Sequence, residues 1–66
     1  MNKKVAKEIC KKINSLMDDA EEQSTITREG QQARQLYLER AQGLRDALDI
    51  AGVQYTTDNW CKCFVD

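Results

Sequence analysis

Three cysteines are the residues of this sequence whose type most directly suggests chemistry. Cys10 stands alone, whereas Cys61 and Cys63 are separated by a single residue. Three thiolates are one ligand short of the four that structural zinc prefers, and its cysteine pairs are usually spaced more widely. An odd number of cysteines also leaves one thiol unpaired in any disulfide scheme. We therefore expect no metal, no other cofactor and no disulfide, and a reducing, cytoplasmic location; a thiolate metal site is kept as a third hypothesis.

Catalytic arrangements are the next possibility, and the composition argues against them. The chain has no histidine, the commonest general base, and no glycine-rich phosphate loop. Its acidic cluster consists of Asp18, Asp19, Glu21 and Glu22. These carboxylates could in principle pair, but a chain of 66 residues is too short to enclose a dry pocket around them. We expect that the chain is not an enzyme.

Basic residues are concentrated near the start of the chain. Five of the ten lysines and arginines are Lys3, Lys4, Lys7, Lys11 and Lys12. They precede the acidic cluster. This order is unfavourable in a helix, because the helix dipole favours acidic residues near the N-terminus and basic residues near the C-terminus. The lysines can bind phosphates, or two such helices can pair antiparallel with basic ends against acidic ends. The third reading is a solvated face without a function, and all three stay open.

Aromatic residues are concentrated at the other end of the chain. Three of the four, Tyr55, Trp60 and Phe64, lie in the last 14 residues. Such side chains are enriched at the centres of protein interfaces, and they also stack on unpaired bases. The alternative is that they close the end of a small core.

Two amphipathic helices must position these residues. Apolar side chains at three- and four-residue steps predict a first helix over about 3–23. Its expected buried face is Val5, Ile9, Ile13, Leu16, Met17 and Ala20, with Ala6 and Cys10 at the edge. After a hydroxyl-rich interruption, a second helix is expected over about 28–51, with Gly52 just past its end. Thr27 is favoured as its N-cap, and Thr25 is nearly as good a candidate. A short connection between such helices predicts an antiparallel pair.

The second helix has more apolar surface than one neighbouring helix can cover. Leu36, Gly43 and Ile50 recur every seven residues, on a side that can face something other than the first helix. Leu38 lies outside the main apolar arc. Arg40 lies inside it, where a guanidinium must extend to solvent or pair across an interface, with Asp18 or Glu21 as the nearest acids.

The tail over 53–65 changes character, because β-branched and aromatic residues flank a turn-like segment at 57–59. A short β-hairpin, or an extended tail, is expected. A two-residue turn places Trp60 and Phe64 on one face, together with Val53 and Tyr55. A three-residue loop instead groups Val53 and Tyr55 with the remaining residues Cys61, Cys63 and Val65.

We therefore predict a mainly α, single small domain over 1–66: a two-helix hairpin with a short β-hairpin, dimerising into a helical bundle. In outline it resembles the Rop family of plasmid copy-number proteins, whose hairpins also dimerise, although the tail has no counterpart there. The expected function is a non-catalytic module that binds and regulates or inhibits a protein, as phage and plasmid accessory proteins do. The candidate partner-binding residues are Leu36, Leu38, Arg40, Gly43, Ile50, Tyr55, Trp60 and Phe64. The alternative is a nucleic-acid-binding regulator that uses the five lysines, and no membrane association is expected.

Overall fold

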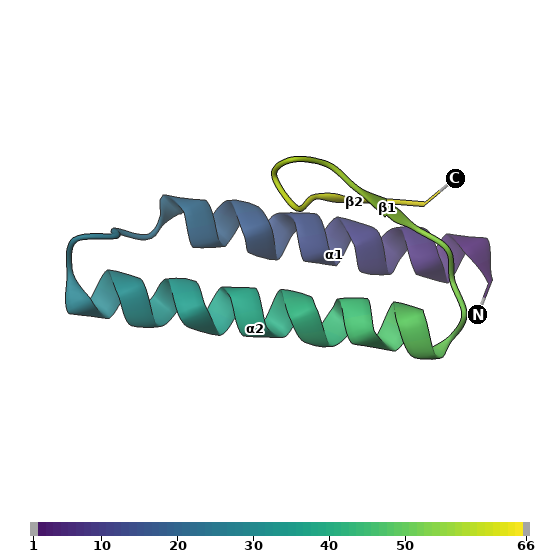
Figure 1. The fold of residues 1–66 in the computed structure, drawn as a ribbon, viewed down its shortest axis with the longest axis horizontal. Helices are drawn as coiled ribbons and strands as arrows, with labels where there is room; N and C mark the ends of the chain where they lie inside the picture. The colour runs from purple at the N-terminus through teal and green to yellow at the C-terminus, as the bar shows by residue number, and fades with distance from the viewer. Residues whose placement is uncertain (1, 66) are drawn as a thin grey trace.

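Two antiparallel helices and a short antiparallel β-hairpin make up the computed structural model, which describes residues 2–65. Helix α1 spans Lys3–Glu22 and helix α2 spans Arg28–Ile50. Strand β1 is Thr56–Thr57 and strand β2 is Cys63–Phe64. The helices lie side by side, and the tail folds back along them from the end of α2 (Figure 1). The predicted order of a helical hairpin followed by a short β-hairpin is confirmed.

Both helices begin at a side-chain cap. The Asn2 side chain accepts a hydrogen bond from the Val5 N–H at 2.8 Å, and Thr27 Oγ1 accepts one from the Gly30 N–H at 3.1 Å. These bonds satisfy backbone donors that have no partner within the helix. Thr27 is therefore the N-cap of α2, as predicted, and Glu29 lies in the first turn, near the positive end of the dipole.

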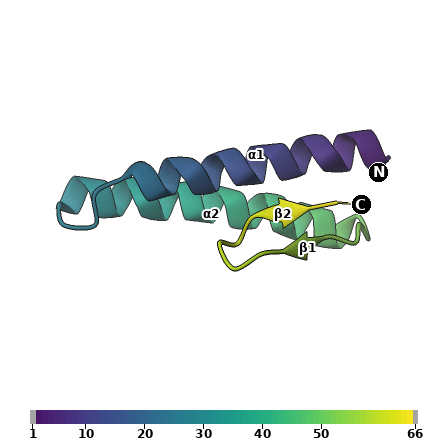
Figure 2. The same ribbon diagram turned by 90° about the horizontal axis from the view of Figure 1, so that it is seen from above.

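The end of α2 is set by Gly52, whose φ of 73° lies in the left-handed region. The Gly52 N–H donates to the Asp49 carbonyl at 3.1 Å, and the Val53 N–H donates to the Leu48 carbonyl at 3.0 Å. This pair of bonds is the Schellman ending that the sequence predicts. It reverses the chain and directs the tail back over the two helices (Figure 2).

The core lies between the helices and the tail. Its buried members are Ala6, Cys10, Ile13, Leu16, Ala20, Ala41, Leu48 and Cys63. Ala6 and Cys10, expected at the edge of the buried face of α1, are only 1% and 5% exposed, whereas Val5 is 44% exposed. The buried face of α1 is therefore rotated relative to the prediction, because the tail packs beside Cys10 and leaves Val5 uncovered.

The register of the β-hairpin pairs Thr56 with Phe64 and Thr57 with Cys63, so the connecting loop has five residues, 58–62. The predicted two-residue turn is wrong, and so is the loop of three residues. The set of residues that the three-residue loop was expected to place on one face is nevertheless largely confirmed. Val53, Tyr55 and Val65 pack on the core around the buried Cys63. Cys61 departs from that grouping because it is exposed.

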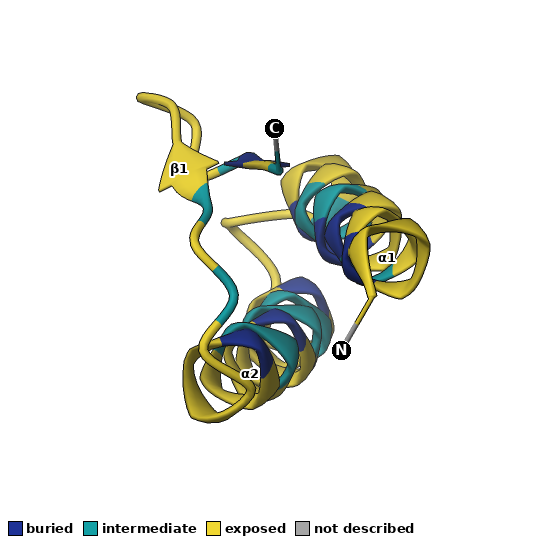
Figure 3. Cartoon of the chain, turned by 90° about the vertical axis from the view of Figure 1, so that its right-hand side faces the viewer, coloured by how far each residue is buried: buried dark blue, intermediate teal, exposed yellow. Residues whose placement is uncertain are grey.

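Seen end-on, the β-hairpin lies on one side of the pair formed by α1 and α2 (Figure 3). The tail leaves Val5 of α1 and Leu36 of α2 about half exposed, at 44% and 47%. The two sides of the helical hairpin therefore differ, and only one of them is covered by the described tail.

Candidate interaction surface

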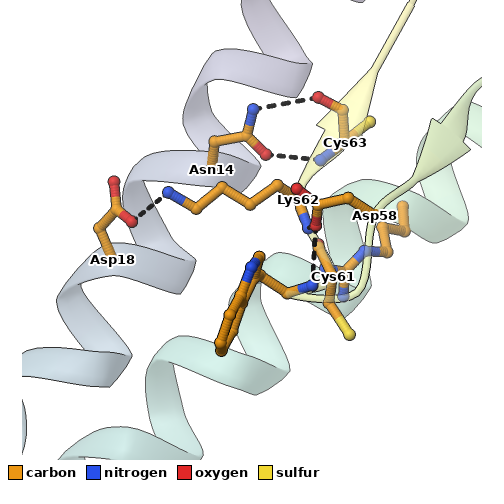
Figure 4. Close-up of polar contacts among 8 residues, drawn as sticks. Asn14, Asp18, Asp58, Cys61, Lys62 and Cys63 are labelled. Atoms are coloured by element: carbon orange, nitrogen blue, oxygen red, sulfur yellow. Dashed lines mark hydrogen bonds and ion pairs between the residues drawn. The ribbon is translucent and has the colours of Figure 1, made fainter.

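A stripe of three residues on α1 holds the tail. Cys10, Asn14 and Asp18 follow one another at four-residue spacing, so they lie on one face of the helix. Asn14 makes two hydrogen bonds to the backbone of Cys63: Nδ2 donates to the carbonyl at 3.0 Å, and the N–H donates to Oδ1 at 2.6 Å (Figure 4). The side-chain amide thus pairs with β2 in the way that a residue of a neighbouring strand would.

Cys63 is also fixed through its side chain, which is buried with Cys10 in the core. Burial, and next the neighbouring Cys10 thiol, raises the pKa of the Cys63 thiol to about 12. The thiolate is the reactive form of cysteine, so a thiol with this pKa is inert at neutral pH. Cys63 therefore serves to pack β2 against α1.

Asp58 shapes the loop at 58–62. Its Oδ1 accepts hydrogen bonds from the N–H groups of Trp60 and Lys62, at 2.8 and 2.9 Å. Its backbone carbonyl accepts a bond from the Cys61 N–H at 3.0 Å. Cys61 closes this loop with a φ of 61°, a left-handed conformation that few residues other than glycine adopt. Because one side chain satisfies two backbone donors, the loop has a defined shape despite its exposure.

Two side-chain contacts with residues distant in sequence anchor the same loop to the helices. The Lys62 ammonium pairs with the Asp18 carboxylate of α1 (Figure 4), and an Arg45 guanidinium nitrogen donates to the Cys61 carbonyl. The hydrogen bond to Asp18 raises the pKa of Lys62. The loop is therefore tied to both helices through two consecutive residues, Cys61 and Lys62, at its β2 end.

Trp60 is the residue that this anchored loop presents. Its exposed fraction is 70%, and that of Phe64 on β2 is 51%. A shallow hollow of about 370 Å³ lies beside Trp60, and Glu21, Asp58 and Lys62 line the rest of it. The arrangement combines a large apolar surface with charged groups at its edge, which is the composition of protein interaction sites.

Tyr55, the third aromatic residue of the tail, is half-buried and packs against the core. Burial, and next the nearby Asp49 carboxylate, raises the pKa of its hydroxyl. Of the three predicted aromatic contacts, Trp60 and Phe64 therefore have most of the accessible surface, and Tyr55 supports the tail.

The predicted residues of α2 form a separate group. Leu36 and Ile50 are 47% and 88% exposed, and nothing within 4 Å faces the position of a Cβ on Gly43. Leu38 is half-buried. Arg40 is exposed, and it makes no hydrogen bond or ion pair with any described residue. Of the two alternatives for Arg40, the structure shows extension to solvent, and the Asp18 carboxylate pairs with Lys62 of the tail.

Four of the five predicted lysines lie together. Lys3, Lys4, Lys7 and Lys11, with Glu8, line a hollow of about 390 Å³ on α1, which Lys12 does not reach. Lys11 pairs with Glu8 at 3.4 Å, and both side chains are largely exposed.

Several residues of the loop anchor were not singled out from the sequence for this role. Asn14 and Asp58 bond to backbone groups that no sequence pattern identifies. Glu21 was noted as part of the acidic cluster and as a possible partner of Arg40, but not as a neighbour of Trp60. A polar side chain at the edge of an apolar helix face, as Asn14 is, was the available signal. It indicates a possible contact with a further element, but the partner depends on where the tail lies.

Within residues 2–65, no three potential ligands are close enough to hold a metal ion, and neither helix has a stretch long and apolar enough to cross a lipid bilayer. Cys61 is exposed on the loop, apart from the buried Cys10 and Cys63.

Comparisons with protein-family models, with curated proteins and with solved structures find no match to this chain.

Proposed function

We propose that this chain is a non-catalytic protein-interaction module whose main contact surface is centred on Trp60. The observation that carries the proposal is a tryptophan that is 70% exposed on a loop anchored to both helices. Tryptophan is among the residues that dominate binding energies at protein interfaces. A loop that is already ordered loses little conformational freedom when a partner binds.

A module of this kind acts by occupying its partner. The described surface offers aromatic and charged contacts and no arrangement of nucleophile and base. We therefore propose that binding regulates or inhibits the partner protein, by covering a surface that the partner needs for another contact.

Affinity capture with variants tests this function. The chain is immobilised and exposed to nuclease-treated lysate of its native host, beside the variants Trp60→Ala and Ile26→Ala. Ile26 is a matched control because it is 90% exposed in the connection between the helices, away from the tail. We expect proteins that the original chain and Ile26→Ala retain but Trp60→Ala does not. Retention of the same proteins by all three would contradict the proposal.

Self-association is the second part of the proposal, and it uses a different surface. Leu36, Gly43 and Ile50 form a stripe along α2, uncovered by α1 or the described tail. The glycine leaves room for a second helix to approach, and basic and acidic ends of α1 can complement one another between copies. We propose a dimer of hairpins formed through this stripe.

Sedimentation over a concentration series tests the dimer. We expect association at high micromolar concentration, loss of it in Ile50→Lys, and no change in Ile26→Lys. A well-folded monomer throughout that range would remove the dimer from the proposal.

Nucleic-acid binding is the alternative function, and one observation favours it: Lys3, Lys4, Lys7 and Lys11 surround the same hollow. Binding through these residues would weaken steeply with salt. Charge reversal at Lys4, Lys7 and Lys11 would abolish it, whereas reversal at Lys12, outside the hollow, would change it little. Absence of binding to single or double strands at low salt would eliminate this alternative.

A further inference from the structure

We infer that the hollow beside Trp60 receives an arginine side chain of the protein partner. The inference rests on the proposed function, in which the Trp60 surface binds a protein. It adds the chemistry of the group that is recognised there. Three features of the hollow carry it: its walls, its charge and its rigidity.

The walls of the hollow match a guanidinium group. Trp60, Glu21 and Asp58 are three of the four residues that line the hollow, and Lys62 is the fourth. A planar guanidinium stacks on an indole ring, and its N–H groups form charge-assisted hydrogen bonds to carboxylates at the same time. An apolar side chain could pack on the indole but would make no charged contact with Glu21 or with the Oδ2 atom of Asp58.

The charge of the hollow also favours a cation. Lys62 is the only basic residue in the lining, and its ammonium is already paired with Asp18. The lining holds two acidic residues, Glu21 and Asp58, and one basic residue, Lys62, which is a net charge of about −1. Adding the two charged groups that contact the loop from outside the lining, Asp18 and Arg45, leaves this net charge unchanged. Glu21 forms no ion pair with any described residue. A negatively charged occupant would be repelled.

The position of the carboxylate of Asp58 is fixed before any ligand arrives. Its Oδ1 accepts the N–H groups of Trp60 and Lys62, and no described residue donates to its Oδ2. The same hydrogen bonds hold the backbone of Trp60. The aromatic and acidic groups are therefore held in place together, and binding needs little rearrangement.

The test uses N-acetyl-arginine amide as the probe and tryptophan fluorescence as the readout. Trp60 is the only tryptophan in the chain, so its emission reports on this hollow alone. We expect a saturable change with a dissociation constant on the order of millimolar, since one side chain supplies few contacts. N-acetyl-citrulline amide, which has the same shape without the charge, is expected to bind at least about fivefold more weakly, as the loss of a charged contact implies.

Two neighbouring glutamates provide a matched pair of variants. Glu21 lines the hollow, whereas Glu22 does not. Glu21→Gln is expected to weaken binding of the arginine probe by about two- to fivefold, the range for an exposed ion pair. Glu22→Gln is expected to leave it unchanged. Equal binding of the arginine and citrulline probes, equal effects of the two variants, or no saturable change would each overturn the inference.

The outcomes separate this inference from the proposed function. If capture of a protein depends on Trp60 while the two probes bind alike, the arginine site is refuted and the interaction module is retained. If the arginine probe binds selectively while capture does not depend on Trp60, the site is real and the proposed function is wrong.

Discussion

The side chain of Asn14 holds both the N–H and the carbonyl of Cys63, a residue 49 positions later in the chain. The two bonds fix β2 to α1, and through β2 they fix the loop that presents Trp60. Each consequence of removing this side chain can be measured.

Asn14→Ala is expected to lower the free energy of unfolding by about 1–3 kcal/mol, because two partly buried backbone groups lose their partners. Chemical denaturation followed by circular dichroism measures the change. Hydrogen exchange at the Cys63 amide is expected to accelerate. Asn59→Ala is the control, since Asn59 is exposed and makes no side-chain hydrogen bond with a described residue. Equal stability of the two variants would show that the Asn14 bonds contribute nothing.

The three thiols are expected to react at very different rates with Ellman's reagent at pH 8. Cys61 is exposed and is expected to react at once, whereas Cys10 and Cys63 are buried and react only when the tail opens. Cys61→Ser should remove the fast phase and leave the slow one. Three thiols reacting at one rate would mean that the tail does not cover Cys10.

Stability is expected to fall as the pH rises above 9. The Cys63 thiol has a pKa of about 12 in the folded chain and an ordinary value of 9.0. Folding therefore favours the protonated thiol, and this contribution is complete below pH 9 and is lost between pH 9 and 12. The raised pKa of Lys62 acts in the same direction, because its charged form is favoured by folding.

Thermal unfolding between pH 7 and 10.5 tests this dependence. The Cys63 contribution is expected to be on the order of 1 kcal/mol at pH 10.5. Cys63→Ala is expected to unfold more easily at pH 7 and to show a flatter dependence on pH. A variant with an unchanged slope would assign the alkaline loss of stability to other groups.

Two glycines of α2 are expected to respond oppositely to alanine. A Cβ at Gly30 would lie 2.3 Å from the Ser24 carbonyl oxygen, so Gly30→Ala must displace the backbone of the connection. We expect it to cost about 1–3 kcal/mol, as overpacking does. A Cβ at Gly43 meets nothing, so Gly43→Ala is expected to stabilise the monomer by about 0.5–1 kcal/mol through helix propensity.

Denaturation of both variants at low concentration measures these changes. If the proposed dimer forms through Gly43, the same alanine is expected to weaken association, which sedimentation can detect. A Gly30→Ala variant that is more stable than the original chain would contradict this prediction. It would show that the connection between the helices can move to accommodate a Cβ at no cost in stability.

The helices could be predicted from the sequence because the signals that set them are local. Thr27 caps the turn that immediately follows it, and Gly52 lies just past the end of α2, four residues after the last buried leucine, Leu48. Such signals need no knowledge of distant contacts. The antiparallel pairing followed directly, since the connection is short.

The tail could be predicted only in outline because distant residues determine it. The loop length depends on Asp58 accepting two backbone N–H groups, and the position of β2 depends on Asn14. Neither bond leaves a periodic pattern in the sequence. Asp18, one of two possible partners considered for Arg40 beside its extension to solvent, pairs with Lys62 of the tail. The aromatic residues of the candidate site could therefore be identified from the sequence. Their arrangement on the surface could not.

The bond between Asn14 and Cys63 also determines the order in which the protein assembles. Contacts within α1 and α2 join residues near in sequence, whereas this bond must close a segment of 49 residues. Because long loops are entropically costly to close, local structure forms faster. We therefore expect the helices to form first and the tail to dock last, so that Cys10 and its neighbours on α1 stay exposed to solvent until the final step of folding.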